Sequence, residues 1–188
     1  VGGPNDPISQ ESLCSRYQQF FKPNDIVVAE TGTSAVTVGG LLLPEGAVYH
    51  NQTLWGSIGW ATPTALGTAI ADPSRRTVLI TGEGSHQLTA NEIGNYGRHG
   101  VKPVIFVLHN EGYAVERVLE EYPDWVYNDL APWPIEADGL GPALALGVAL
   151  AVAPTGPTVG QGTTGASTLE WEPCEDRPSV QCATLTVP

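Results

Sequence analysis

The segment Thr77–Glu116 contains the residues whose types and spacing best suit chemistry. Glu83 stands between two glycines a short way after a run of apolar residues, and Asn110 follows a second apolar run further along the chain. Oxygen ligands, a Gly-rich turn and the start of a helix together suit a divalent cation bridged to a phosphate. The segment therefore predicts a metal-and-phosphate site that includes Glu83 and Asn110.

The two apolar runs, VLI and PVIFVL, are short and bounded by Gly and polar residues, as buried strands are. Between them, Leu88, Ile93 and Tyr96 fall at helical spacing, which predicts one crossover helix. A right-handed strand–helix–strand crossover returns the chain to the same end of a parallel sheet. Glu83 and Asn110 are therefore expected side by side at the carboxyl ends of two strands, where open α/β sheets bind ligands.

The same segment resembles the diphosphate-binding motif of thiamine diphosphate (ThDP) enzymes, which reads GDG, then a spacer, then NN. In that family the motif Asp, the second Asn and a backbone carbonyl two residues later hold Mg²⁺. These ligands correspond here to Glu83, Asn110 and the carbonyl of Gly112. The sequence departs from the pattern twice, because Glu83 replaces the Asp and His109 replaces the first Asn. The longer Glu side chain either is absorbed by a small backbone shift or weakens Mg²⁺ binding.

Three blocks resemble one branch of that family, the 2-keto acid decarboxylases. They are Ala29–Ser34 (AETGTS), Leu54–Trp60 (LWGSIGW) and Asn110–Glu116 (NEGYAVE). The resemblance implies a carboxy-lyase that converts a 2-keto acid into an aldehyde and CO₂ without oxidation. It also implies an α/β fold, with a mainly parallel sheet and helices on both faces, as in the C-terminal pyrophosphate-binding domain of these enzymes.

The resemblance assigns the cofactor to two groups of residues. Gly84 and Ser85 would offer backbone N–H and hydroxyl donors to the diphosphate, although Ser85 is also a good helix-capping residue. The carbonyl of Gly56, beside Ser57, would accept a hydrogen bond from the 4′-amino group of the cofactor. Ile58 would wedge under the cofactor and hold its two rings in a bent shape.

Thr33 and Glu116 complete the implied site. The resemblance places Thr33 near the cofactor, and it places Glu116 opposite the carboxylate of the substrate. A buried carboxyl near other anionic groups has a raised pKa, which suits acid catalysis near neutral pH. The alternative for Glu116 is a solvent-facing carboxylate on a helix.

Several of these residues also fit ordinary structural roles. Glu83 alone is typical of a solvated turn carboxylate, and the hydroxyls of Thr31 and Thr33 are typical of turn stabilisation. His86 is expected on a helix surface, with proximity to phosphate as the alternative. His109 either supports its loop by hydrogen bonding or marks degeneration of the motif.

Two other protein classes compete with the decarboxylase interpretation. A degenerate or orphan domain would keep the fold without catalysis. A Rossmann-type nucleotide-binding domain would also place a Gly-rich turn between strand and helix, but Gly82-Glu83-Gly84 lacks the third glycine of GxGxxG. A serine hydrolase fits less well still, because GEGSHQ is not GxSxG.

Charge and composition limit the partners. The net charge of −12 argues against nucleic acid and anionic membranes, which require basic patches. No apolar stretch reaches membrane-spanning length. The odd, widely spaced set of 3 Cys is typical of reduced thiols in a cytoplasmic protein. The expected small-molecule partner is a 2-keto acid.

The chain of 188 residues predicts one domain with flanking segments. Residues 1–8 are expected to be a linker remnant, 9–133 the ThDP domain, and 134–188 an irregular tail, rich in Gly, Ala, Pro and Thr, that is disordered or incompletely folded. A frame-shifted or chimeric terminus is our hypothesis for that tail. The chain begins with Val1 and contains no Met, so we expect a fragment.

The expected fragment lacks half of its active site. In the family, a Glu from a pyrimidine-binding domain, usually in a neighbouring subunit of a homo-oligomer, activates the cofactor. We therefore expect the isolated chain to be inactive and to bind ThDP weakly at best. The remaining predicted elements are strands at 26–29 and 47–50, and helices from Ser9 or Ser12 to Phe21, at 57–71 and at 113–121.

Overall fold

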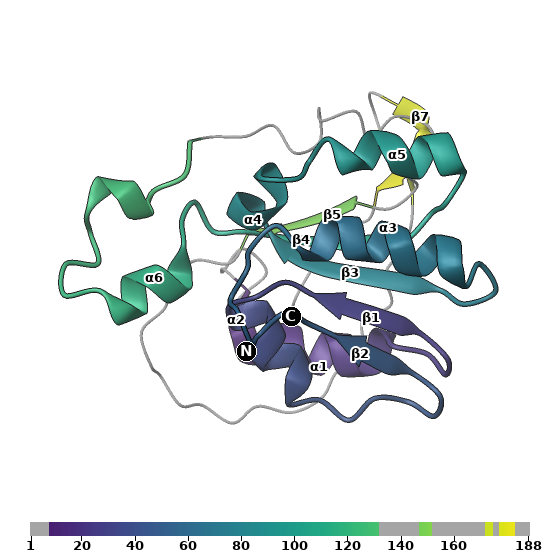
Figure 1. Cartoon of the computed structure of the whole chain (residues 1–188), viewed down its shortest axis with the longest axis horizontal. Coiled ribbons are helices and arrows are strands. Elements are labelled where there is room, and N and C mark those ends of the chain that lie inside the picture. Colours follow the sequence, from purple (N-terminus) through teal and green to yellow (C-terminus); the bar gives the residue numbers. More distant parts are fainter. Residues whose placement is uncertain (1–7, 132–146, 152–171, 175–176, 183–188) are drawn as a thin grey trace.

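A parallel sheet forms the centre of the computed structural model, which describes residues 8–131, 147–151, 172–174 and 177–182 (Figure 1). The five-stranded sheet has the order β2-β1-β3-β4-β5, and all of its neighbouring strands are parallel. The predicted α/β class with a parallel sheet is confirmed. The strands are β1 (Ile26–Ala29), β2 (Val48–His50), β3 (Thr77–Gly82), β4 (Val104–His109) and β5 (Gly147–Ala151).

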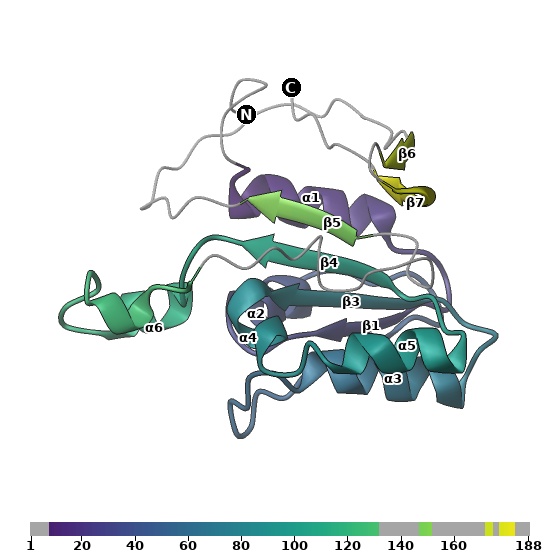
Figure 2. The same ribbon diagram turned by 90° about the horizontal axis from the view of Figure 1, so that it is seen from above.

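Helices cover both faces of the sheet, as predicted, because alternate residues of each strand point to opposite faces. Val27 and Ala29 pack in one apolar cluster with residues of α1 (Gln10–Phe20) and α2 (Thr33–Gly39). Ile26 and Val28 pack in a second cluster with residues of α3 (Ala61–Ala71) and α5 (Glu92–His99). Figure 2 shows α3 and α5 together on one side of the strands.

The first helix begins where one of the two predicted caps stands. The hydroxyl oxygen of Ser9 accepts a hydrogen bond from the Ser12 N–H at 3.2 Å, which satisfies one of the free N–H groups at the helix start. Tyr17 is 2% exposed and its ring centre lies 5.2 Å from that of Phe106 on β4. The helix is thereby anchored to the centre of the sheet.

Two helix predictions are wrong in their boundaries. The helix predicted from Ser57 begins only at Ala61, because Gly59 adopts a left-handed backbone with φ of +80° that no helix continues through. The crossover between β3 and β4 contains two helices rather than one, α4 (Glu83–Gln87) and α5. Leu88, predicted within that single helix, lies between α4 and α5 and is 55% exposed.

The strand order determines where a ligand can bind. From β1 the chain runs to β2 on one side, and then crosses to β3 on the other side of β1. Open α/β sheets bind ligands outside the carboxyl ends of strands at such a reversal. The order also differs from that of the dinucleotide-binding Rossmann fold, which runs 3-2-1-4-5-6. The Rossmann alternative therefore lacks support from the sheet as well as from the motif.

The segments after β4 complete the described structure. Helix α6 (Ala114–Leu119) is shorter than the predicted 113–121, and a 3-10 turn, η1 (Val126–Asn128), follows it. Within the predicted tail, β5 extends the parallel sheet, and β6 (Glu172–Cys174) pairs antiparallel with β7 (Arg177–Cys182). The remaining tail residues, and residues 1–7 of the predicted linker, lie outside the described residues. The domain boundary at 133 stays a prediction.

No helix among the residues described is long and apolar enough to cross a membrane.

Candidate functional site

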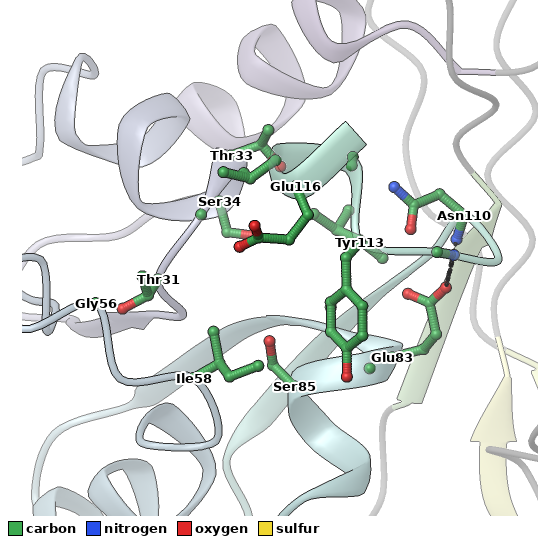
Figure 3. A pocket seen from close by; sticks show the side chains of 17 residues that line it. Thr31, Thr33, Ser34, Gly56, Ile58, Glu83, Ser85, Asn110, Tyr113 and Glu116 are labelled. Atoms are coloured by element: carbon green, nitrogen blue, oxygen red, sulfur yellow. Dashed lines mark hydrogen bonds between the residues drawn. The ribbon is translucent and has the colours of Figure 1, made fainter. Parts of the chain in front are cut away.

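A cavity of about 480 Å³ opens at the carboxyl ends of β1, β3 and β4 (Figure 3). This volume lies within the usual range for small-molecule sites, about 300–1,000 Å³. Nine of the ten predicted site residues line it, and Ser57 is the exception. The lining residues are Thr31, Gly32, Thr33, Ser34, Gly56, Ile58, Gly82, Glu83, Gly84, Ser85, Leu108, Asn110, Gly112, Tyr113, Ala114, Val115 and Glu116.

The three predicted metal ligands converge at one end of the cavity. Glu83 is 3% exposed, so it is not the solvated turn carboxylate of the alternative interpretation. Its Oε1 accepts the backbone N–H of Asn110 at 3.1 Å (Figure 3) and that of Gly112 at 3.3 Å. The Glu side chain therefore joins the end of β3 to the turn after β4, at the place where the parallel crossover was predicted to bring them together.

The same three groups suit a cation chemically. With its amide nitrogen turned toward them, Asn110 donates to Gly112 O at 2.9 Å and to the two Glu83 carboxylate oxygens at 3.2 and 3.3 Å. With the amide reversed, its oxygen faces those three oxygens instead. In the first orientation the amide satisfies these oxygens itself. In the second, the carboxylate, carbonyl and amide oxygens together are the kind of ligands that a hard cation such as Mg²⁺ takes. The donor set therefore fits Mg²⁺.

A cation here would have one carboxylate ligand, and its other protein ligands would be amide and carbonyl oxygens. Among the residues that the structure describes, no group of three or more His, Cys, Asp and Glu side chains is arranged to hold a metal ion. Glu83 is thus the one carboxylate of the predicted ligand set. Because Mg²⁺ keeps several waters and often binds substrate phosphates, a set with one carboxylate is compatible with it.

Gly84 and Ser85 form the floor of the cavity beside Glu83. A Cβ atom on Gly84 would lie 2.7 Å from the ring of Tyr113 and 2.6 Å from the side chain of Leu130, so only glycine allows this packing. Ser85 is 7% exposed and lines the cavity within α4. The alternative role of Ser85 as helix cap is wrong, because Gly82 occupies that position.

Tyr113 is a cavity residue that the sequence interpretation missed as a site residue. Its backbone N–H donates to Asn128 O at 3.0 Å, and Figure 3 shows its ring directed toward Ser85. A signal was present, because Tyr113 belongs to the NEGYAVE block. Its ring covers the predicted diphosphate-binding residues and shapes this end of the cavity.

The opposite wall combines the turn after β1 with the loop before α3. Gly56 has a left-handed φ of +63°, and Ile58 is 41% exposed while lining the cavity. The Thr31 hydroxyl donates to Gln52 O at 2.8 Å, which supports its role in stabilising the turn. Thr33, by contrast, lines the cavity at the start of α2.

Ser57 lies outside the cavity lining and is exposed. Its carbonyl oxygen lies 3.5 Å from the Thr31 hydroxyl, so its backbone faces the β1 turn. The structure therefore gives Ser57 a place in the wall, but it does not bring the Ser57 side chain to the cavity.

Glu116 extends from α6 into the cavity, as Figure 3 shows. The expectation that its carboxyl is buried is wrong for this chain, because Glu116 is exposed. The physical reason is the position of α6, which projects away from the sheet in Figure 1 and has no buried residue. Glu116 therefore reaches the site from a segment that is open to solvent.

The two histidines of the motif occupy different environments. His86 is 2% exposed, so its expected place on a helix surface is wrong; its Nδ1 lies 3.1 Å from the Thr62 hydroxyl on α3. Burial lowers the pKa of His86, which favours the neutral imidazole. His109 is the last residue of β4 and is half-buried, and both of its proposed roles stay open.

The parallel sheet, with a cavity at the carboxyl ends of its strands, defines an α/β cofactor-binding domain. The family described as "Thiamine pyrophosphate enzyme, C-terminal TPP binding domain" matches residues 30–134, more than half of the chain. The chain therefore belongs to this family, and the family resemblance of its motifs is confirmed.

Curated relatives and a solved structure are similar to this chain. The alpha-keto-acid decarboxylase of Mycobacterium ulcerans is 43% identical over 129 residues, which cover 69% of this chain and 23% of the relative. The alpha-keto-acid decarboxylase of Mycobacterium bovis is 42% identical over 131 residues, with the same shares. The chain thus spans about a quarter of the length of these relatives.

The fold is also similar to that of benzoylformate decarboxylase from Polynucleobacter necessarius. The TM-score is 0.69 at 16% sequence identity, and the similarity covers 81% of this chain and 35% of the other. At this identity the likeness concerns the fold alone.

Proposed function

We propose that this chain supplies the diphosphate-binding half of the ThDP site in a 2-keto acid decarboxylase, which converts a 2-keto acid into an aldehyde and CO₂. The convergence of Glu83, Asn110 and Gly112 at one end of the cavity carries the proposal. The names of the Mycobacterium relatives, alpha-keto-acid decarboxylases, support the reaction type.

Each wall of the cavity would hold a different part of the cofactor. Glu83, Asn110 and the Gly112 carbonyl would hold Mg²⁺, while Gly84 and Ser85 would face the diphosphate. On the other wall, Thr33, Gly56, Ser57 and Ile58 would position the cofactor rings. When bound, ThDP supplies a thiazolium ring that accepts the electrons released as CO₂ leaves.

Glu116 would act on the substrate side of the cavity. Its carboxyl would face the carboxylate of a 2-keto acid and would move a proton during product formation. Its exposure in this chain supports the need for a further domain that covers it. We assign that place to a pyrimidine-binding domain of the same or another subunit, within a homo-oligomer in the cytoplasm.

Calorimetry tests the cofactor assignment directly. ThDP and Mg²⁺ added together should release heat that neither ligand produces alone, because Glu83 and Asn110 would hold a metal that also binds the diphosphate. NAD serves as the control ligand and should give no heat. Absence of a joint ThDP and Mg²⁺ signal would instead favour a degenerate domain that only folds.

Turnover tests the need for the further domain. The isolated chain should not decarboxylate pyruvate or phenylpyruvate, because Glu116 is open to water and the proposal assigns activation of the cofactor to the pyrimidine-binding domain. Measurable aldehyde formation by the purified chain would contradict this part of the proposal.

A further inference from the structure

Glu30 is a buried carboxyl that the proposed function does not use. It follows the last residue of β1 and is 1% exposed. It does not line the cavity. A buried carboxyl is costly unless its oxygens accept hydrogen bonds, so the partners of Glu30 indicate its role.

The two oxygens of Glu30 accept from two separate segments. Oε1 accepts the backbone N–H of Thr31 at 3.0 Å, and Oε2 accepts the backbone N–H of Ala61 at 3.3 Å. Burial raises the pKa of Glu30, whereas N–H groups of Thr31, Ala61 and Gly59 and the Thr81 hydroxyl act in the opposite direction. The carboxylate is thus surrounded by donors that favour its charged form.

The two segments together form the wall of the cavity that lies opposite the predicted metal ligands. Thr31 opens the turn that contains Thr33, and Ala61 is the first residue of α3, directly after the loop with Gly56 and Ile58. Glu30 therefore joins both segments at the base of this wall. The Thr31 hydroxyl joins the same segments nearer the cavity, through Gln52 O at 2.8 Å.

We propose that Glu30 is a positioning residue whose carboxylate sets the spacing between the Thr33 turn and the Ile58 loop, and so their fit to the cofactor. This inference rests on the proposed function. Only a carboxylate offers two acceptors and no donor at this place. Gln would turn an NH₂ group toward one of the two N–H donors, and Asp, one methylene shorter, would not reach both.

Nuclear magnetic resonance of the isolated chain tests the link without cofactor. In the unaltered chain, the amide protons of Thr31 and Ala61 should titrate with one shared midpoint above the ordinary Glu value of 4.5. In Glu30→Gln both titrations should vanish, and resonances of the Gly56–Ile58 loop should shift. Independent midpoints for the two amides, or an unchanged loop in Glu30→Gln, would overturn the proposal. The first comparison needs no variant to fold.

Cofactor affinity tests the consequence for the site. Glu30→Gln and Glu30→Asp should each weaken Mg²⁺-dependent ThDP binding by about tenfold, the loss typical when a supporting hydrogen bond behind a site is removed. Glu45→Gln, at an exposed position away from the cavity, is the matched control and should bind as the unaltered chain does. Full ThDP affinity in Glu30→Asp would contradict the expectation that the shorter side chain cannot accept from both the Thr31 and the Ala61 N–H groups.

The two proposals fail in different ways. If the unaltered chain shows no joint signal with ThDP and Mg²⁺, the proposed function fails, and the amide titrations alone decide whether Glu30 sets the spacing between the Thr33 turn and the Ile58 loop. If the unaltered chain binds ThDP but both Glu30 variants bind equally well, the cofactor site stands and the positioning role is wrong.

Discussion

Oε1 of Glu83 lies 3.1 Å from the backbone nitrogen of Asn110, so the end of β3 and the turn after β4 are joined by a single side chain. Because Oε1 also accepts the Gly112 N–H at 3.3 Å, Glu83 holds the backbone that presents the Gly112 carbonyl. The extra methylene of Glu, relative to the Asp of the family motif, thus does not prevent the carboxylate from reaching this turn.

The first prediction concerns the charge of Glu83. Glu83→Gln should lower Mg²⁺-dependent ThDP affinity by at least about tenfold, because the one carboxylate of the proposed ligand set is lost. Titration of ThDP at several Mg²⁺ concentrations measures this. Glu83→Asp keeps the charge and should retain metal-dependent binding. Equal Mg²⁺ dependence in the Gln variant and the unaltered chain would exclude Glu83 as a ligand.

The second prediction compares two glycines. A Cβ on Gly112 would lie 2.7 Å from the backbone oxygen of Asn128, which cannot move aside easily, whereas nothing lies within 4 Å of a Cβ on Gly94. Gly112→Ala should therefore lower the free energy of unfolding by about 1–3 kcal/mol through overpacking. Urea denaturation measures the change.

Gly94→Ala is the matched control for that experiment. Gly94 lies within α5 and is exposed, so alanine should raise the free energy of unfolding by about 0.4–1 kcal/mol. Similar effects of the two substitutions would contradict the close packing of Gly112 beneath the returning chain.

The parallel core was predictable because its signals are local. The run at Ile26–Ala29 is apolar throughout and forms β1 with the predicted bounds, since a strand buried on both faces needs no polar alternation. The turns after β3 and β4 were also predictable, because Gly and polar residues end both apolar runs. Right-handed crossover then brings Glu83 and Asn110 to one edge of the sheet.

What the sequence could not predict depends on contacts between distant segments. Gly59 ends the loop before α3 in a left-handed conformation, and a Cβ there would lie 3.0 Å from Leu88 Cβ, a neighbour set only by the folded chain. Glu30 meets the Ala61 N–H across 31 positions of sequence. No local pattern reports either contact, so both the late start of α3 and the role of Glu30 were missed.

The third prediction concerns pH and His86. Burial lowers the pKa of His86 below its ordinary value of 6.5, so between the two values the unfolded chain binds more protons than the folded one. This His86 contribution to the free energy of unfolding should therefore be present above pH 6.5. It should fall as pH decreases below 6.5, until the pH passes the folded pKa.

The pH dependence of the free energy of unfolding is compared between His86→Gln and the unaltered chain. Glu30, whose raised pKa acts with the opposite sign, is present in both chains, so the difference isolates the contribution of His86. Urea denaturation of His86→Gln across pH 5–7 should lack the slope that the His86 proton adds to the unaltered chain. His99→Gln is the control, because His99 is exposed at the end of α5. Identical pH dependence of His86→Gln and the unaltered chain would contradict a buried neutral imidazole.

The fourth prediction concerns the segment that carries Glu116. Arg117 Nη2 lies 2.6 Å from Asp129 Oδ1, and this ion pair connects α6 to the chain that returns past Gly112. Both side chains are partly exposed, so Arg117→Met should change the free energy of unfolding by less than about 1 kcal/mol.

Hydrogen exchange should respond to the same substitution. The Tyr113 amide donates to Asn128 O at 3.0 Å, and its exchange should become faster in Arg117→Met, because the ion pair helps to keep the segment before α6 next to the segment that contains Asn128. Arg98→Met, on the exposed surface of α5, should change neither quantity. Unchanged exchange at Tyr113 would show that the ion pair does not keep α6 and the returning chain together, and a large loss of global stability would show that it contributes more than an exposed ion pair does.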